Sequence, residues 1–227
     1  MKILFSGDSF TYGDELPNRE KDRFSRLVSE HYSAEEINVA ENGSSNDKIV
    51  RKVFEYLNLF DADAVVIQFS VLSRYELFKI NLEDQKGNGD FVSICPSDTG
   101  NGEFFFGDDW RQMKARPYYK HIQNNATDQQ RYFQQILLLQ LCLKQKNIPY
   151  VMLHLEDFHY KQHHLYRPNY FKDECEDFES IIPNLIGKHF TENFCPDLRK
   201  KGHPDKHGTH PNPKGHRLIA DHIISKL

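Results

Sequence analysis

Residues 2–10 read KILFSGDSF, and this stretch decides the fold class that the sequence predicts. Its first part, residues 2–6, is a short and mainly apolar run that Gly7 stops, which is typical of a buried strand in a parallel sheet. Gly7 permits a tight turn, and Ser9 follows two residues later. Since ligands of open α/β sheets lie beyond the carboxyl ends of the strands, we expect Ser9 at the functional edge of the sheet.

Strands and helices alternate along the rest of the chain. Residues 64–69, AVVIQF, form the clearest strand, and further strands are expected at 37–40 and 149–153. Apolar residues at helical spacing predict helices near residues 24–32, 49–57, 127–143 and 213–227, with a weaker signal at 178–186. This alternation predicts right-handed βαβ units and a three-layer α/β domain around a central parallel sheet.

Polar residues mark where the helices are expected to begin. The expected caps are Asn46 or Asp47, Thr127 with Asp128, and Asn212, which Pro213 follows.

Residues 75–125 show no sustained period, so we interpret them as an insertion in a single domain of residues 1–227. The insertion is rich in aromatic residues that either pack a satellite core or shape a lid over a substrate, namely Phe104, Phe105, Phe106, Trp110, Tyr118 and Tyr119.

Composition and charge narrow the classes of partner. The net charge is -4 and both signs are interspersed, so no basic surface for nucleic acid or an anionic membrane is expected. The four cysteines form no CxxC pair, and the apolar run at the N-terminus is too short for a signal peptide. We therefore expect a cytoplasmic protein, or a virion-associated one if the source is viral, that acts on small molecules. Its oligomeric state stays open.

A histidine-rich segment near the other end of the chain supplies a partner for Ser9. Residues 207–216 read HGTHPNPKGH, which places His210 in a loop just before the last predicted helix. A serine hydroxyl is a poor nucleophile until a neighbouring imidazole takes its proton. Ser9 and His210 on separate loops of one sheet edge are therefore a candidate nucleophile and general base.

These motifs, taken in order, resemble those of the SGNH/GDSL hydrolases, a family of serine esterases. The shared features are Gly-Asp-Ser after the first strand, a glycine after the second, and His-Pro-x-x-x-Gly-His before the last helix. The resemblance implies a flavodoxin-like three-layer sandwich and ester or acetyl-ester hydrolysis without a cofactor or metal. Position by position it implies that Ser9 is the nucleophile, that His210 is the general base, and that the N–H groups of Ser9 and Gly43 hold the oxyanion.

The chain departs from the family pattern after the third strand. The family has Gly-x-Asn-Asp there, whereas this chain has Ser70-Val-Leu-Ser-Arg74, with Leu72 where the asparagine would stand. This resembles an atypical, viral-looking subset with a hydroxyl residue and an arginine after the strand. Ser70, or otherwise Ser73 or Arg74, is then expected to replace the missing donor. Asn46, Arg74 and Trp110 are candidate substrate-binding residues.

A second departure concerns the acid of the triad. The family places an aspartate three residues before the histidine, where this chain has His207. Asp205 lies two residues earlier and is the expected orienting acid, with His207 itself or a backbone carbonyl as alternatives. These departures leave open a second reading, in which the chain is a ligand-binding or structural module that keeps the fold with weakened catalysis.

Two other functions have less support in the sequence. A nucleotide-dependent enzyme would need a GxGxxG or Walker loop, and the chain has neither. Histidines and carboxylates cluster at residues 154–164 and 203–207, but without the ligand spacing of known zinc motifs. We therefore expect no bound metal and regard His216 as a structural partner on the last helix.

Overall fold

The computed structural model describes residues 1–80, 89–95, 109–155, 182–185 and 210–227. Its centre is a four-stranded sheet in the order β2-β1-β3-β6, and every neighbouring pair is parallel. The strands are β1 (Lys2–Ser6), β2 (Glu35–Asn38), β3 (Ala64–Phe69) and β6 (Tyr150–His154). The predicted parallel α/β sheet is confirmed, with β2 beginning two residues earlier than expected.

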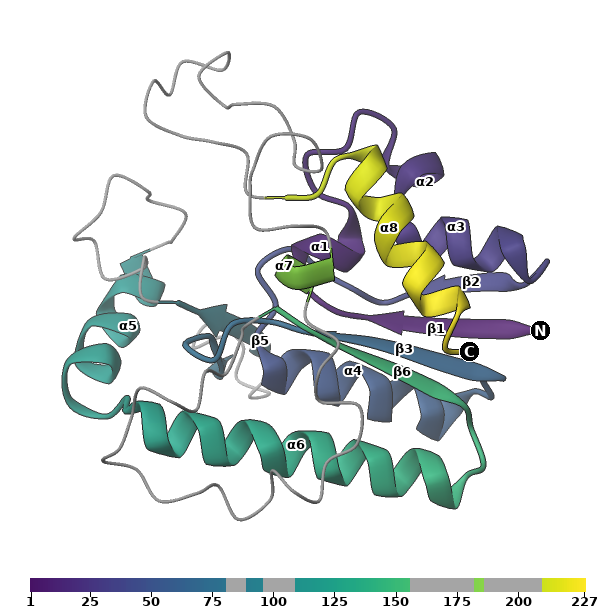
Figure 1. The fold of residues 1–227 in the computed structure, drawn as a ribbon. Helices are drawn as coiled ribbons and strands as arrows, with labels where there is room; N and C mark the ends of the chain where they lie inside the picture. The colour runs from purple at the N-terminus through teal and green to yellow at the C-terminus, as the bar shows by residue number, and fades with distance from the viewer. Residues whose placement is uncertain (81–88, 96–108, 156–181, 186–209) are drawn as a thin grey trace.

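Helices cover both faces of this sheet and make three layers (Figure 1). On one face lie α4 (Asn46–Leu59) and α6 (Asn125–Gln145), whose apolar residues pack with Leu4, Val65 and Met152. On the other face lie α3 (Phe24–His31) and α8 (Pro213–Ile224), which pack on the intervening strand residues such as Ile3 and Val66. The alternation of side chains along each strand thus divides the apolar core into two halves.

Three short helices also belong to the described part of the chain. They are α1 (Ser9–Tyr12), α2 (Arg19–Asp22) and α7 (Ile182–Leu185). Within the described residues, no helix combines the length and the apolar character that crossing a membrane would require.

The observed caps correct two of the sequence predictions. Ser45 caps α4, because its hydroxyl accepts the Lys48 N–H, and Asn124 caps α6 by accepting the Thr127 N–H at 2.9 Å. The expected caps Asn46 and Asp47 lie inside the first turn of α4 and hydrogen-bond to other parts of the fold. Asn212 caps α8 as predicted, with Pro213 at its first position.

The stretch from 75 to 125, which the sequence analysis interpreted as an insertion, contains regular structure that periodicity did not indicate. It holds an antiparallel hairpin of β4 (Tyr75–Ile80) and β5 (Gly89–Ile94), and helix α5 (Asp109–His121). Tyr75 packs with Ile94, Ala115, Tyr118 and Tyr119 in a small separate core. For Tyr118 and Tyr119 the structure therefore favours core packing; Phe104, Phe105 and Phe106 lie outside the described residues.

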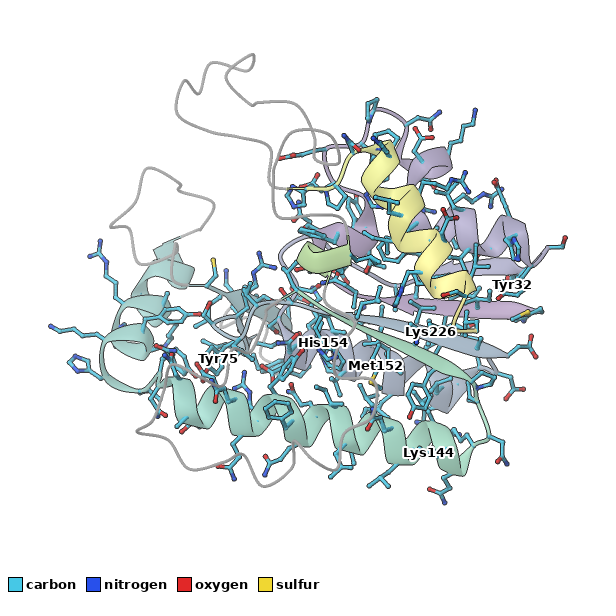
Figure 2. All side chains as sticks on the ribbon, in the orientation of Figure 1. Tyr32, Tyr75, Lys144, Met152, His154 and Lys226 are labelled. Carbon is cyan, nitrogen blue, oxygen red and sulfur yellow. The ribbon has the colours of Figure 1, made fainter. Side chains whose placement is uncertain are left out.

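Among the described residues, two histidines are buried in the main fold. His154 ends β6 and lies between the sheet and α6 (Figure 2). The Tyr132 hydroxyl hydrogen-bonds to Nδ1 of His154. His216 in α8 stacks on Phe24, and its Nδ1 accepts the Phe24 N–H at 3.1 Å. Burial lowers the pKa of His154 to about 4 and that of His216 to about 3, and the charge of His210 contributes to the latter. His216 is thus a structural residue, as expected.

These two pKa values predict a protein that loses stability in mild acid. Because both folded pKa values lie below the ordinary 6.5, the unfolded chain takes up protons first as the pH falls. Stability is therefore intact above about pH 6.5 and declines toward pH 4, by about 2 kcal/mol for each histidine at pH 5. Urea unfolding at pH 7 and pH 5 measures this difference.

A non-titrating variant separates this effect from general acid sensitivity. His216→Asn keeps an acceptor near the position of Nδ1, and the difference between pH 7 and pH 5 should shrink by about 2 kcal/mol. His121 is exposed, so His121→Gln should behave like the unmodified chain. An unchanged pH dependence in His216→Asn would contradict the assignment.

Candidate active site

Ser9 lies at the carboxyl end of β1, in a turn that the sequence shapes closely. A Cβ at Gly7 would lie 2.1 Å from Thr11 Oγ1 and 2.8 Å from Gln68 Oε1, so only glycine fits there. Asp8 then caps α1 by accepting the Phe10 N–H on Oδ1 at 3.0 Å. Ser9 is the first residue of this short helix and is almost buried.

The structure brings Ser9 and His210 together from opposite ends of the chain. Nε2 of His210 lies 2.8 Å from Ser9 Oγ, which is hydrogen-bonding distance. The ring of Phe10 lies beside the imidazole, with the two ring centroids 5.4 Å apart. The predicted pair is therefore within reach for proton transfer from the hydroxyl to the imidazole.

A carboxylate that the sequence analysis did not identify lies on the other side of this imidazole. Oε1 of Glu15 is 3.2 Å from Nδ1 of His210, and both side chains are only 15% exposed. Glu15 follows α1, which Gly13 ends in the left-handed conformation, and Glu15 itself has a positive φ of 63°. The turn after α1 thus directs a carboxylate back to the histidine, six residues after Ser9.

Glu15 is therefore a second candidate for the orienting acid, beside Asp205. Asp205 and His207 lie outside the described residues. The one feature of the sequence that could have indicated Glu15 is that this carboxylate follows Ser9 by only six residues. The related family carries its acid beside the histidine instead, three residues before it.

Gly43 precedes α4 in the loop after β2. Its φ is 75°, and a Cβ there would meet nothing within 4 Å, so backbone conformation rather than crowding favours glycine. Among the described residues, neither the Gly43 N–H nor the Ser9 N–H has a hydrogen-bond acceptor. Both groups therefore remain available to a ligand.

The loop after β3 is tied to the other two loops by buried hydrogen bonds. The Ser70 hydroxyl donates its one hydrogen to Asp8 Oδ2 at 2.7 Å, so in this arrangement that hydrogen is not directed at an oxyanion. The Asn46 amide bonds both the N–H and the carbonyl of Ser70, at 2.7 and 3.1 Å. Asn46 is buried, and both ends of its side chain serve this connection.

Arg74 joins the same group of side chains. Its Nη1 donates to Asp8 Oδ2 at 2.9 Å and to Ser70 Oγ at 2.7 Å. The remaining candidate substrate-binding residue, Trp110, falls in the first turn of α5, and its side chain is outside the described part of the structure. No group of three or more metal-ligating side chains occurs among the described residues.

Comparison with protein families gives one match. The model of a family of unknown function, DUF6071, matches residues 14–222, which is most of the chain. The protein belongs to the DUF6071 family. No curated protein matches this DUF6071 chain.

Solved structures show what fold the DUF6071 chain shares with known proteins. A protein assigned to the G-D-S-L lipolytic family from Desulfitobacterium hafniense is 12% identical, with a TM-score of 0.52 over 100% of this chain and 99% of that one. The esterase EstA from Pseudoalteromonas sp. is 12% identical, with a TM-score of 0.48 over 99% and 95%. An acetyl xylan esterase is 16% identical, with a TM-score of 0.46 over 99% and 98%.

The first of these likenesses confirms the SGNH-type fold expected from the sequence motifs. At 12% identity it concerns the fold alone. The chemistry of the DUF6071 site therefore depends on its own geometry. That geometry aligns a hydroxyl, an imidazole and a carboxylate, with two backbone N–H groups that have no acceptor in the described chain.

Proposed function

We propose that this protein is a serine hydrolase that cleaves carboxylic esters, with O-acetyl esters included in the class. The observation that carries the proposal is the 2.8 Å contact between Ser9 Oγ and His210 Nε2, with Glu15 on the opposite ring nitrogen. A carboxylate on Nδ1 holds the proton there, so that Nε2 is the basic nitrogen facing the serine.

In the acylation step, His210 Nε2 takes the hydroxyl proton of Ser9 as Oγ attacks the ester carbonyl carbon. A tetrahedral oxyanion forms, and the imidazole becomes positively charged. Glu15 stabilises that charge through Nδ1. Collapse of the intermediate breaks the bond to the alcohol oxygen, which receives the proton from Nε2, and leaves the acyl group on Ser9.

Deacylation reverses the roles of the same groups. His210 takes a proton from water, the hydroxide attacks the acyl carbon, and the proton returns to Ser9 Oγ as the acid leaves. Each step uses only groups of the chain, the ester and water, so the proposed mechanism needs no cofactor or metal.

We assign the backbone N–H groups of Ser9 and Gly43 as the hydrogen-bond donors that stabilise the oxyanion. Their lack of an acceptor in the described chain supports this assignment. Ser70 and Asn46 support it indirectly, because they tie the loop that carries Gly43 to the turn that carries Ser9. A developing negative charge is stabilised best by donors that are already held in place.

The alternative of a binding module with weakened catalysis had two supports in the sequence. One was the histidine at the position of the triad acid, and Glu15 now supplies a carboxylate at His210. The other was the absence of the third-block asparagine, with Leu72 in its position. The second support remains, and a direct test of the nucleophile decides between the two functions.

That test is covalent labelling with a fluorophosphonate, which requires an activated serine but no knowledge of the natural substrate. We expect one phosphonyl group per chain, located on Ser9 by peptide mass spectrometry, and none in Ser9→Ala. Ser33 is an exposed serine on a turn, so Ser33→Ala should label like the unmodified protein. An unlabelled Ser9 after prolonged incubation would overturn the hydrolase proposal and favour the binding module.

A further inference from the structure

Arg74 is held beside the nucleophile by buried polar groups. Its Nη1 donates to Asp8 Oδ2 at 2.9 Å and to Ser70 Oγ at 2.7 Å, and the Ser70 hydroxyl donates to the same carboxylate oxygen. Asp8 and Ser70 are essentially inaccessible to solvent. Such closed contacts with a buried carboxylate fix the position of a side chain that is otherwise flexible.

The guanidinium has donors left over. Its Nη1 carries two hydrogens, and the two contacts described above account for both. Nε and Nη2 carry three more N–H groups, which have no acceptor among the described residues. The Arg74 side chain is 24% exposed, so it is partly open to solvent. Its free edge presents two parallel N–H groups, the arrangement that binds a carboxylate with two hydrogen bonds.

Arg74 is joined through Asp8 to the turn that carries Ser9. β1 and β3 are adjacent and parallel, with Ser6 opposite Ile67, so the loops that follow them leave the sheet side by side. Arg74 lies in the loop after β3, and its partner Asp8 directly precedes Ser9. The acyl group is bonded to Ser9 in the proposed intermediate, next along the chain to the Asp8 that holds Arg74.

We propose that Arg74 binds a carboxylate carried by the acyl group, so that the preferred substrates are half-esters of dicarboxylic acids. This inference rests on the proposed hydrolase function and names its substrate class. Asp8 already balances the charge of Arg74, so binding depends on directional hydrogen bonds more than on net charge. A planar monoanion fits that situation better than a dianionic phosphate.

Matched esters test the proposal. The p-nitrophenyl half-esters of succinate, glutarate and adipate are compared with p-nitrophenyl butyrate, valerate and hexanoate, after subtraction of the rate with Ser9→Ala. At the best chain length we expect kcat/KM for the half-ester to exceed that for its neutral counterpart by at least about tenfold, because hydrogen bonds between charged groups contribute about that factor or more. The difference should appear mainly in KM. In Arg74→Met the ratio should fall to about one.

The quantity compared is the ratio of kcat/KM for the half-ester to kcat/KM for the neutral ester within each variant. A general loss of activity caused by the unpaired Asp8 carboxylate lowers both values and leaves this ratio unchanged. If Arg74→Met does not fold, Arg74→Lys keeps the charge beside Asp8 but lacks the parallel donors, and its ratio should also fall. Arg26 lies in α3 and pairs with Glu30 on the surface, so Arg26→Met removes one charge at a distance and should leave the ratio unchanged.

A binding measurement keeps this test separate from hydrolysis. Monomethyl glutarate and monomethyl adipate should bind Ser9→Ala, as measured by calorimetry, at least about tenfold more tightly than they bind Ser9→Ala/Arg74→Met. If no ester is cleaved in a Ser9-dependent way but this difference appears, the hydrolase function fails and the carboxylate site stands.

Three results would overturn the carboxylate site. The first is neutral esters cleaved as well as half-esters, with no binding difference. The second is a preference for half-esters that persists in Arg74→Met, and the third is a stronger preference for an acyl group that ends in a phosphonate.

Discussion

Hydrolysis of short p-nitrophenyl esters is expected to fall by about 10³- to 10⁶-fold in kcat/KM when either Ser9 or His210 is replaced by alanine. Ser9→Ala removes the atom that attacks, and His210→Ala removes the base 2.8 Å away from it. Because the two side chains act as one unit, the double variant should be hardly slower than either single variant. Initial rates measured without added metal or nucleotide test this result.

The same experiment has a clear contrary outcome. His121 is exposed on α5, so His121→Ala serves as a control for the loss of a histidine and should keep full activity. If the unmodified protein is no faster than Ser9→Ala with any acyl chain length, the serine mechanism does not operate on such esters. The fold would then serve to bind a ligand.

Glu15→Gln is expected to lower kcat by about 10²- to 10⁴-fold while changing KM little. The substitution keeps the size of the side chain but removes the charge 3.2 Å from His210 Nδ1. A neutral amide neither stabilises the imidazolium that forms in each step nor secures the required tautomer. Glu15 does not touch the reacting atoms, so it is a positioning residue, and the loss should appear in kcat and in the pH profile.

Asp205→Asn is the matched control for this prediction, because the sequence motifs point to Asp205 and the structure points to Glu15. We expect Asp205→Asn to keep activity within a few-fold of the unmodified protein. A large loss in Asp205→Asn together with an active Glu15→Gln would return the acid to the position that the related family uses. Glu15→Asp adds a further comparison, since a shorter carboxylate should restore part of the rate.

Local sequence patterns were sufficient for the sheet and for the positions of three candidate site residues. Residues 2–6 and 64–69 are strands because short, mainly apolar segments of this kind are buried on both faces of a parallel sheet. Ser9 and Gly43 could be located because each follows a strand, and His210 because its motif precedes a capped helix. For each of these three residues, the strand end or the motif that indicated its position lies within a few residues of it in the sequence.

The helix caps and the hairpin show where local patterns were insufficient. Asn46 and Asp47 are good cap residues, but tertiary contacts engage both side chains and Ser45 caps α4 instead. In β4, Tyr75 and Leu77 contact a small core that includes residues of α5, whereas Phe78 on the other face is exposed, so apolar residues do not mark a single face. Tertiary hydrogen bonds of Asn46 and Asp47 thus decided which residue caps α4. Packing against residues distant in the sequence decided the β4–β5 hairpin.

The sequence by itself determined the α/β fold class, the first strand with its Gly-Asp-Ser turn, and the pairing of a serine with a histidine, because each follows from local periodicity or a short motif. Only the tertiary structure assigned Glu15 to His210, 195 positions further along the chain, and joined Asp8 to Ser70 and Arg74. Those contacts connect loops that follow different strands. Their distances depend on how the strands are ordered in the sheet and how each loop turns, which no segment of the chain specifies alone.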